Sequence, residues 1–178
     1  GYAEVFQRNV LASGVIPQIS AILGPCAGGA VYSPAITDFI FMSDSSSYMF
    51  VTGPEVVKTV THEKVTSEYL GGATTHAKKS GVADFVFDNE IVVLQQIRRL
   101  IDFLPASNKS DSKIKKNDTN FNIHIPSLDK IIPKDKNKPY DMKDLILKIA
   151  DNEDFFEVQK DYAPNIIIGF IRIEGHTI

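Results

Sequence analysis

The stretch that most constrains this chain runs from residue 24 to 34 and has the sequence Gly-Pro-Cys-Ala-Gly-Gly-Ala-Val-Tyr-Ser-Pro. Residues 16–23 before it are apolar and rich in β-branched side chains, which predicts a buried strand. A helix is expected over 31–36, although Pro34 limits its regularity unless it lies in the first turn. Such a strand-to-helix turn leaves backbone N–H groups without partners, and its glycines let a ligand approach the backbone closely.

Two interpretations of this turn follow from the residues alone. Free N–H groups at a helix start can stabilise a developing negative charge, so the turn can build an oxyanion hole without a side chain. A tight turn that binds nothing has the same composition, because glycine-rich turns are weak signals. The residues leave both interpretations open.

The first hundred residues alternate predicted strands and helices, which indicates an α/β layered domain. Apolar residues at helical spacing predict a first helix that Gly14 ends as its C′ residue, with Tyr2, Val5, Phe6 and Val10 at that spacing. Short strands are expected at 39–42, 48–51 and 82–87, and the serine run 45–47 separates the first two. A small helical unit is expected from Leu70-Gly71-Gly72-Ala73 to Ser80-Gly81.

Two further helices carry clear start signals. Pro54 suits the first helical position of one of them, and the buried face expected for it consists of Val56, Val57 and Val60. Asp88 or Asn89 is expected to cap the other, and its expected apolar face consists of Leu94, Ile97, Ile101 and Leu104.

The composition changes after residue 104. Residues 105–139 are rich in Ser, Asn, Lys, Asp and Pro and predict a linker. The basic run 113–116 within it is interpreted either as a solvated tether or as a docking patch for an anionic partner. Beyond it, Asp141 is expected to cap a helix over 142–150, residues 155–158 to form a strand, and 165–178 to form a hairpin turning at Glu174-Gly175.

Several function classes find no support in the residues. The net charge of −3 argues against a general nucleic-acid binder, and no apolar run is long enough to span a bilayer. The single cysteine, Cys26, excludes an internal disulfide and fits a reducing compartment. No signal peptide is visible; because the chain starts with glycine and stops within an apparent strand, we expect a fragment.

The chain also lacks an obvious nucleophile or metal site. The turn carries no hydroxyl at its critical positions, Ser33 has no evident partner, and Cys26 is interpreted as a small buried residue rather than a thiolate. His62, His76, His124 and His176 show no metal-ligand spacing, and His76 is expected to make a local hydrogen bond. No P-loop sequence is present. An oxyanion hole at this turn would therefore serve chemistry whose base arrives with a substrate or cofactor.

The sequence as a whole resembles a known family, the carboxyltransferase β subunits of biotin-dependent propionyl-CoA carboxylases. The resemblance extends over nearly the whole chain apart from the linker, and rests on segments 1–6, 13–20, 24–35, 50–58, 68–73, His76, 80–83, 140–142, 154–157 and 165–170.

The resemblance implies a crotonase-like (ClpP/crotonase) layered β-β-α superhelix. Residues 1–104 would be the later half of a first carboxyltransferase domain, 105–139 an interdomain linker and 140–178 the beginning of a second domain. It implies transfer of CO2 from carboxybiotin to the α-carbon of propionyl-CoA, which gives methylmalonyl-CoA. It places the acyl-CoA oxyanion hole on the backbone of Gly28 and Gly29, with Pro25, Ala27 and Ala30 as substrate-binding neighbours.

The resemblance further implies biotin carried on a partner, a biotin-carboxylase α subunit, a hexameric β core, and a location in the bacterial cytoplasm or the mitochondrial matrix. No metal, nucleic acid or membrane partner is expected, and the chain alone is expected to be inactive. Three alternatives remain: a crotonase-type hydratase or isomerase, whose carboxylate base would be Asp38 or Asp44; a decarboxylase subunit; and a non-catalytic remnant or interaction module.

Overall fold

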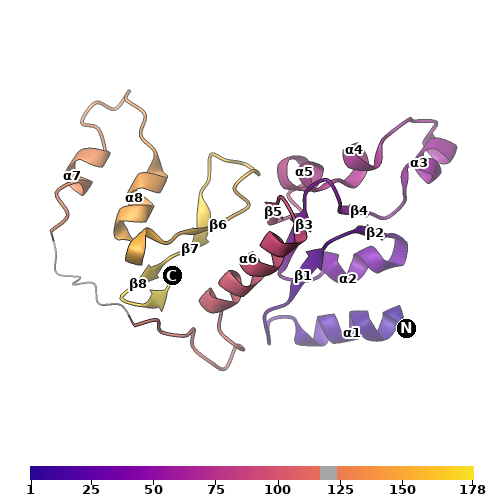
Figure 1. Ribbon diagram of the computed structural model, residues 1–178, viewed down its shortest axis with the longest axis horizontal. Coiled ribbons are helices and arrows are strands. Elements are labelled where there is room, and N and C mark those ends of the chain that lie inside the picture. The colour runs from indigo at the N-terminus through magenta and orange to yellow at the C-terminus, as the bar shows by residue number, and fades with distance from the viewer. Residues whose placement is uncertain (117–123) are drawn as a thin grey trace.

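The computed structural model describes residues 1–116 and 124–178 (Figure 1). The first part of the chain, residues 1–104, contains a three-stranded parallel sheet in the order β1-β3-β5. Its strands are β1 (Ile19–Ile22), β3 (Phe39–Ser43) and β5 (Phe85–Phe87). Ile19 pairs with Phe39, and Phe41 pairs with Phe85. The expected strands and the α/β layering are confirmed in this part of the chain.

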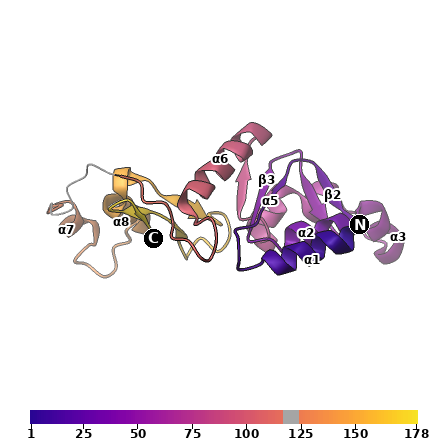
Figure 2. The same ribbon diagram turned by 90° about the horizontal axis from the view of Figure 1, so that it is seen from below.

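Both faces of this sheet are covered, because side chains alternate between the faces along a strand. Ile40 and Met42 of β3 belong to one apolar cluster with Val31, whereas Phe41 belongs to a second with Leu100 of helix α6 (Glu90–Phe103). Figure 2 shows α6 on one side of the sheet and α1 (Tyr2–Ala12) and α2 (Tyr32–Ala35) on the other.

A second, two-stranded parallel sheet corrects the expectation of a direct turn from strand to helix. After Gly24 the chain forms β2 (Pro25–Ala27), which pairs with β4 (Tyr48–Phe50) rather than with the first sheet. A short 3-10 helix, η1 (Gly28–Val31), then leads into α2. Strand β4, the pairing partner, lies more than twenty residues away along the chain, so the local sequence of the turn does not predict β2.

The remaining helices of the first part begin and end mostly where local signals place them. Gly14 has φ +70° and ends α1, and the Asn89 side chain accepts the Val92 N–H at 3.0 Å to cap α6. Between them lie α3 (Pro54–Thr61), with Pro54 in the first turn, α4 (Ser67–Gly71), α5 (Ala73–Thr75) and a π-helical turn, η2 (His76–Ser80), that ends at Gly81.

The predicted helix faces were wrong in two places. On α3, Val56 and Val60 are 49% and 72% exposed, and the helix projects from the body of the molecule, so only Val57 is partly buried (Figure 1). On α6, the expected Ile97 and Leu104 do pack against the aromatic core, but Leu94 and Ile101 are half exposed. The buried residues of α6 are Val93, Leu100 and Phe103. Helix α6 is apolar on two overlapping stripes, and packing against the aromatic core selects between them.

The C-terminal part contains α7 (Leu128–Ile131), α8 (Met142–Ile149), a short 3-10 turn η3 (Asp151–Glu153), and four short strands. Strand β6 (Phe156–Val158) pairs antiparallel with β7 (Ile168–Phe170), and β8 (Arg172–Ile173) pairs with β9 (His176–Thr177). The Asp141 carboxylate caps α8 by accepting the Lys143 N–H at 2.9 Å, as predicted. The hairpin at Glu174-Gly175 is also confirmed, with positive φ at both residues. Residues 165–173 form two strands in different ladders instead of one.

One aromatic core joins the two parts. Phe85 stacks on Phe41 with ring centroids 4.3 Å apart and contacts Phe156 of β6 at 5.0 Å. Phe156 also lies 5.9 Å from Phe103 of α6. Phe156 is therefore buried in a cluster to which the first sheet and α6 contribute most of the buried residues.

Polar contacts reinforce this junction. Arg99 of α6 forms an ion pair with Asp154, and the buried Arg172 donates to the Asp102 carbonyl at 2.7 Å. The Gln159 amide donates to the Gly81 carbonyl at 3.1 Å. In the basic run, the side chain of Lys115 is exposed, while its N–H donates to the Gly175 carbonyl at 3.0 Å and fixes the backbone there.

Candidate active site

A residue outside the glycine turn stabilises the backbone conformation of the turn. Gly28 has φ +65°, a conformation that a side chain disfavours, and its N–H donates to the Val51 carbonyl at 3.0 Å. The first of the two predicted oxyanion-hole amides is therefore engaged with the residue that directly follows β4. Sequence reasoning missed this contact because the donor and the acceptor are distant along the chain.

Gly29 is the residue of this turn that can offer its amide. It is the second residue of η1, and the N–H groups at the start of a helix have no acceptor within the helix. Gly29 is exposed, and a Cβ built on it would meet only the Tyr2 ring, at 3.9 Å. Gly29 is thus an exposed residue with space at its Cα, and its N–H lies in the first turn of η1.

The three expected substrate neighbours lie within four residues of Gly29 along the chain. Pro25 and Ala27 are exposed and lie on the same face of β2, because residues two apart in a strand point the same way. Ala30 is partly buried one residue beyond Gly29. The structure places these residues next to the turn, and their contact with a substrate stays a prediction.

Cys26 points to the opposite face of β2 and packs against the apolar cluster that contains Ile22 and Val31. Its thiol is free, and burial raises its pKa above the ordinary value. A raised pKa keeps the thiol protonated at neutral pH and makes it a poor nucleophile. The interpretation of Cys26 as a small buried residue fits this environment.

Other polar side chains near the turn are engaged in structural hydrogen bonds. The Ser33 hydroxyl donates to the Asn9 amide oxygen at 2.8 Å, and the Asp38 carboxylate accepts the Gln18 N–H at 2.8 Å. Asp38 therefore lies beside Gln18, where β1 and β3 begin, at the edge of the sheet away from the turn. Asp44 follows the end of β3, on the same edge as Gly24, and its backbone N–H donates to the Phe87 carbonyl at 2.8 Å. His76 makes the local hydrogen bond expected of it, to Ser80, and a second one to the Met49 carbonyl, which is distant along the chain.

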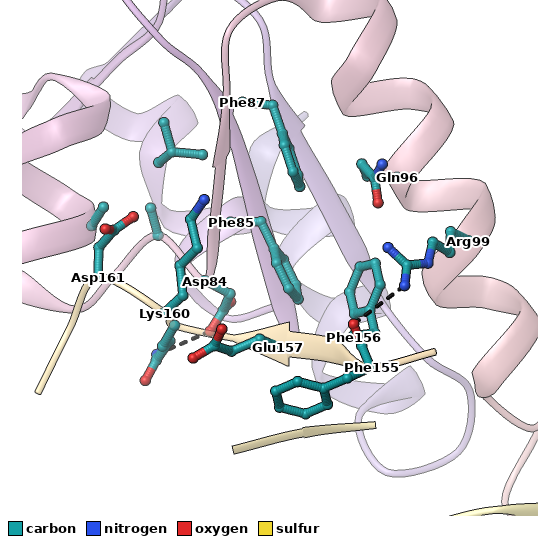
Figure 3. Close-up of a pocket in the computed structure, with 14 residues that line it drawn as sticks. Asp84, Phe85, Phe87, Gln96, Arg99, Phe155, Phe156, Glu157, Lys160 and Asp161 are labelled. Carbon is teal, nitrogen blue, oxygen red and sulfur yellow. Dashed lines mark hydrogen bonds between the residues drawn. The ribbon is translucent and has the colours of Figure 1, made fainter. Parts of the chain in front are cut away.

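A separate cavity of about 160 Å³ lies between β5, α6 and β6 (Figure 3). Its polar lining includes Asp84, Arg99 and Glu157, and none of the predicted site residues lines it. The Asp84 carboxylate accepts the Ile40 N–H at 2.8 Å and the Gln159 amide at 3.0 Å. Burial raises the pKa of Asp84, and these hydrogen bonds oppose the shift.

Asp84 had no assigned role in the sequence. Its only signal was a carboxylate inside the apolar segment 82–87, which does not identify its partners. In the structure it bridges β3 and Gln159 and so belongs to the junction between the two parts of the chain.

The described residues contain no group of three or more His, Cys, Asp or Glu side chains arranged to hold a metal ion. Within residues 1–116 and 124–178, no helix has both the length and the apolar character needed to cross a membrane.

Comparison with known proteins places these features in one family. Residues 1–178 match the family model described as carboxyl transferase domain. The chain is 64% identical to the propionyl-CoA carboxylase beta chain of Cereibacter sphaeroides, covering all of this chain and 35% of that protein. It is 53% identical to the methylmalonyl-CoA decarboxylase subunit alpha of Propionigenium modestum, covering all of this chain and 34% of that protein.

A solved structure shares the fold over almost the entire chain. A transcarboxylase 12S structure, described as a hexamer assembly with methylmalonyl-coenzyme A and methylmalonic acid bound, superposes with a TM-score of 0.94 at 42% identity. The match covers 99% of this chain and 34% of that one. This chain thus spans about a third of the length of the relatives it matches. It belongs to the carboxyl transferase domain family and has the crotonase-like α/β fold of those carboxyltransferases.

Proposed function

We propose that this chain is part of the carboxyltransferase subunit of a biotin-dependent acyl-CoA carboxylase. The subunit transfers CO2 from carboxybiotin to the α-carbon of propionyl-CoA and forms methylmalonyl-CoA. The 64% identity to a propionyl-CoA carboxylase beta chain over the whole of this chain supports the reaction and the substrate. The matching region is about a third of the C. sphaeroides relative, and residues outside that third complete the proposed site.

The observation that carries this proposal is the exposed Gly29 amide in a turn with a fixed backbone. Removal of the α-proton of a thioester places negative charge on the thioester oxygen. An N–H group already aimed at that oxygen stabilises the charge without reorganising and contributes about 3 kcal/mol in the transition state. The Gly28–Val51 hydrogen bond holds the backbone immediately before Gly29 and so limits such reorganisation.

The residues around the turn fit a reaction whose base comes from a cofactor. Cys26 is a protonated, half-buried thiol, and Ser33 and Asp38 are engaged in structural hydrogen bonds. When bound, carboxybiotin supplies both CO2 and the group that accepts the α-proton. This chain's own part is to bind the acyl-CoA along β2 and to orient its thioester oxygen toward Gly29, with Pro25 and Ala27 on the adjoining face.

We also propose a domain organisation and a set of partners for this subunit. Residues 1–104 form the later half of a first domain, 105–139 a linker and 140–178 the start of a second domain. The subunit forms a homohexamer and receives biotin from a biotin-carboxylase α subunit, in the bacterial cytoplasm or the mitochondrial matrix. The hexamer assembly named for the transcarboxylase 12S structure supports the oligomer.

A pair of substitutions in the complete subunit tests the role of Gly29. Gly29→Pro removes the N–H, whereas Gly29→Ala keeps it and adds a methyl group that meets the Tyr2 ring only at ordinary contact distance. We expect Gly29→Pro to lower kcat for carboxylation about 10²- to 10³-fold and Gly29→Ala to stay much closer to wild type. Size-exclusion chromatography establishes that both variants assemble. Wild-type kcat in an assembled Gly29→Pro variant would remove Gly29 from the mechanism.

A second candidate is the reverse chemistry, decarboxylation of methylmalonyl-CoA, which the 53% identity to a decarboxylase subunit favours. The same thioester enolate forms in that direction, so Gly29 keeps its role. A catalyst accelerates both directions of this transfer, so the biotin-carrying partner distinguishes the two candidates. ATP-dependent carboxylation of biotin by the assembled complex supports the carboxylase, and its absence supports the decarboxylase. A hydratase or isomerase instead requires a carboxylate base at the turn. The Asp38 carboxylate is bonded to Gln18 at the opposite edge of the sheet, so Asp44 is the remaining candidate for that base. Full carboxylation activity in an Asp44→Asn variant of the complete subunit would argue against this alternative.

A further inference from the structure

His76 makes two hydrogen bonds, and the direction of the one to Met49 is fixed by its acceptor. Its Nε2 lies 2.5 Å from the Met49 carbonyl oxygen, and its Nδ1 lies 2.8 Å from the Ser80 hydroxyl oxygen. A carbonyl can only accept, so Nε2 carries the hydrogen and donates. The Ser80 hydroxyl is the partner of Nδ1, so both ring nitrogens have a hydrogen-bond partner.

Met49 is the central residue of β4, and it is buried. It pairs with Cys26 in β2, which leads directly into Gly28. The two strands form a two-stranded sheet, and among the described residues no third strand continues that sheet beyond β4. His76 supplies the donor for a carbonyl that the pairing with β2 leaves available.

The same carbonyl is approached from a second direction. A Cβ built on Gly71 would lie 2.3 Å from the Met49 oxygen, so the end of α4 packs directly against it. Tyr48 also forms an isolated antiparallel bridge with Gly72. The α4–α5 segment and His76 therefore contact β4 along the edge that faces away from β2.

Strand β4 in turn holds the glycine turn at two points. Its pairing with β2 fixes Pro25, Cys26 and Ala27, and the Val51 carbonyl directly after it accepts the Gly28 N–H. A displacement of β4 is therefore transmitted to the residue that precedes Gly29. The series of contacts runs from the His76 ring through the Met49 carbonyl and β4 to the turn.

We propose that His76 is a positioning residue that sets the direction of the Gly29 amide through the Met49 carbonyl. This inference rests on the proposed function, because it assigns His76 a role in the oxyanion hole described there. Both ring nitrogens of His76 are engaged with Met49 and Ser80, so its loss acts on the transition state through geometry. Misplacement of a reacting group by about 1 Å can cost about a hundredfold in rate.

Two substitutions of His76 by residues of similar volume distinguish the loss of the N–H donor from the loss of packing. His76→Gln keeps an N–H donor at a similar reach, and His76→Leu fills the space without one. His62→Asn is a matched control, because His62 is exposed, ends α3 with φ +62°, and asparagine tolerates that conformation. Each variant is made in the complete subunit, assembled with its biotin-carrying partner, and assayed for carboxylation of propionyl-CoA.

We expect His76→Leu to lower kcat at least about tenfold with KM for the acyl-CoA within about twofold, since only the transition state needs the aligned amide. His76→Gln and His62→Asn should stay within about threefold of wild type in kcat. Equal kcat in assembled His76→Gln and His76→Leu variants would overturn the inference, as would a loss confined to KM. If His76→Leu does not assemble, His76→Gln decides alone: a loss beyond about tenfold in the assembled protein refutes the role of the donor. Wild-type protein without carboxylation activity would instead refute the proposed function and this inference with it.

Discussion

Replacing Gly71 by alanine should loosen the β2–β4 sheet. Gly71 is buried, and the added Cβ would lie 2.3 Å from the Met49 oxygen, 2.9 Å from the Met49 carbonyl carbon and 2.8 Å from the Phe50 ring. Real Cβ atoms do not approach other atoms this closely, so either α4 or β4 must move. The Phe50 ring can rotate, but the Met49 carbonyl belongs to a paired strand and cannot turn away alone.

The contacts of the added Cβ indicate how much stability Gly71→Ala should lose. Overpacking a buried site costs about 1–3 kcal/mol, and contact with a fixed backbone atom places Gly71→Ala at the upper end. A loss of about 3 kcal/mol from local stability raises the equilibrium constant for local opening about 150-fold, since 1.4 kcal/mol corresponds to tenfold. The opening should be concentrated in β4 and its partner β2.

Native-state amide hydrogen exchange of the complete subunit, followed by mass spectrometry, measures this opening. Peptides that contain β2 and β4 should exchange about 150-fold faster in Gly71→Ala than in wild type. Gly24→Ala is the control, because a Cβ there meets nothing within 4 Å. Wild-type exchange in these peptides of Gly71→Ala, or equal acceleration by Gly24→Ala, would refute the steric reasoning.

Three other predictions concern single side chains. Iodoacetamide should modify Cys26 far more slowly at neutral pH than a free cysteine peptide, because burial raises the thiol pKa; labelling at the peptide's rate would contradict this. Since the pKa of Asp84 is raised on folding, the folded state binds its proton more readily, and stability should fall as pH rises from about 4 through the raised pKa. Asp84→Asn should remove that slope in pH-dependent thermal unfolding, and an unchanged slope would assign it to another group. Asn89→Ala should destabilise α6 by about 1 kcal/mol in hydrogen exchange, because the Val92 N–H loses its cap; no change would refute the cap.

Features fixed by neighbouring residues could be predicted from the sequence. Gly14, Asn89 and Asp141 mark helix ends or starts, and Glu174-Gly175 marks a hairpin turn. In each case the residue that stabilises the feature lies within a few positions of it. The strands of the first sheet were also expected, because their apolar runs differ clearly from the segments around them.

Features that depend on distant partners could not be predicted in this way. The sequence of α6 offers two apolar stripes, and only the position of Phe41, Phe85 and Phe156 shows which one is buried. Strand β2 exists because β4 pairs with it, and the Gly28 amide is occupied because Val51 lies beside it. For the candidate site, the sequence identified the glycine turn and could not distinguish the engaged amide of Gly28 from the open one of Gly29.

The shared aromatic core has a consequence for synthesis on the ribosome. Phe156 closes a core whose other walls are β3, β5 and α6, and the nearby Gln159–Gly81 hydrogen bond joins residues 78 positions apart. While residue 104 is being made, Phe41, Phe85 and Phe103 have no cover from β6. The nascent chain must therefore carry an exposed aromatic surface until the segment around Phe156 emerges, a period in which a chaperone has a defined place to bind.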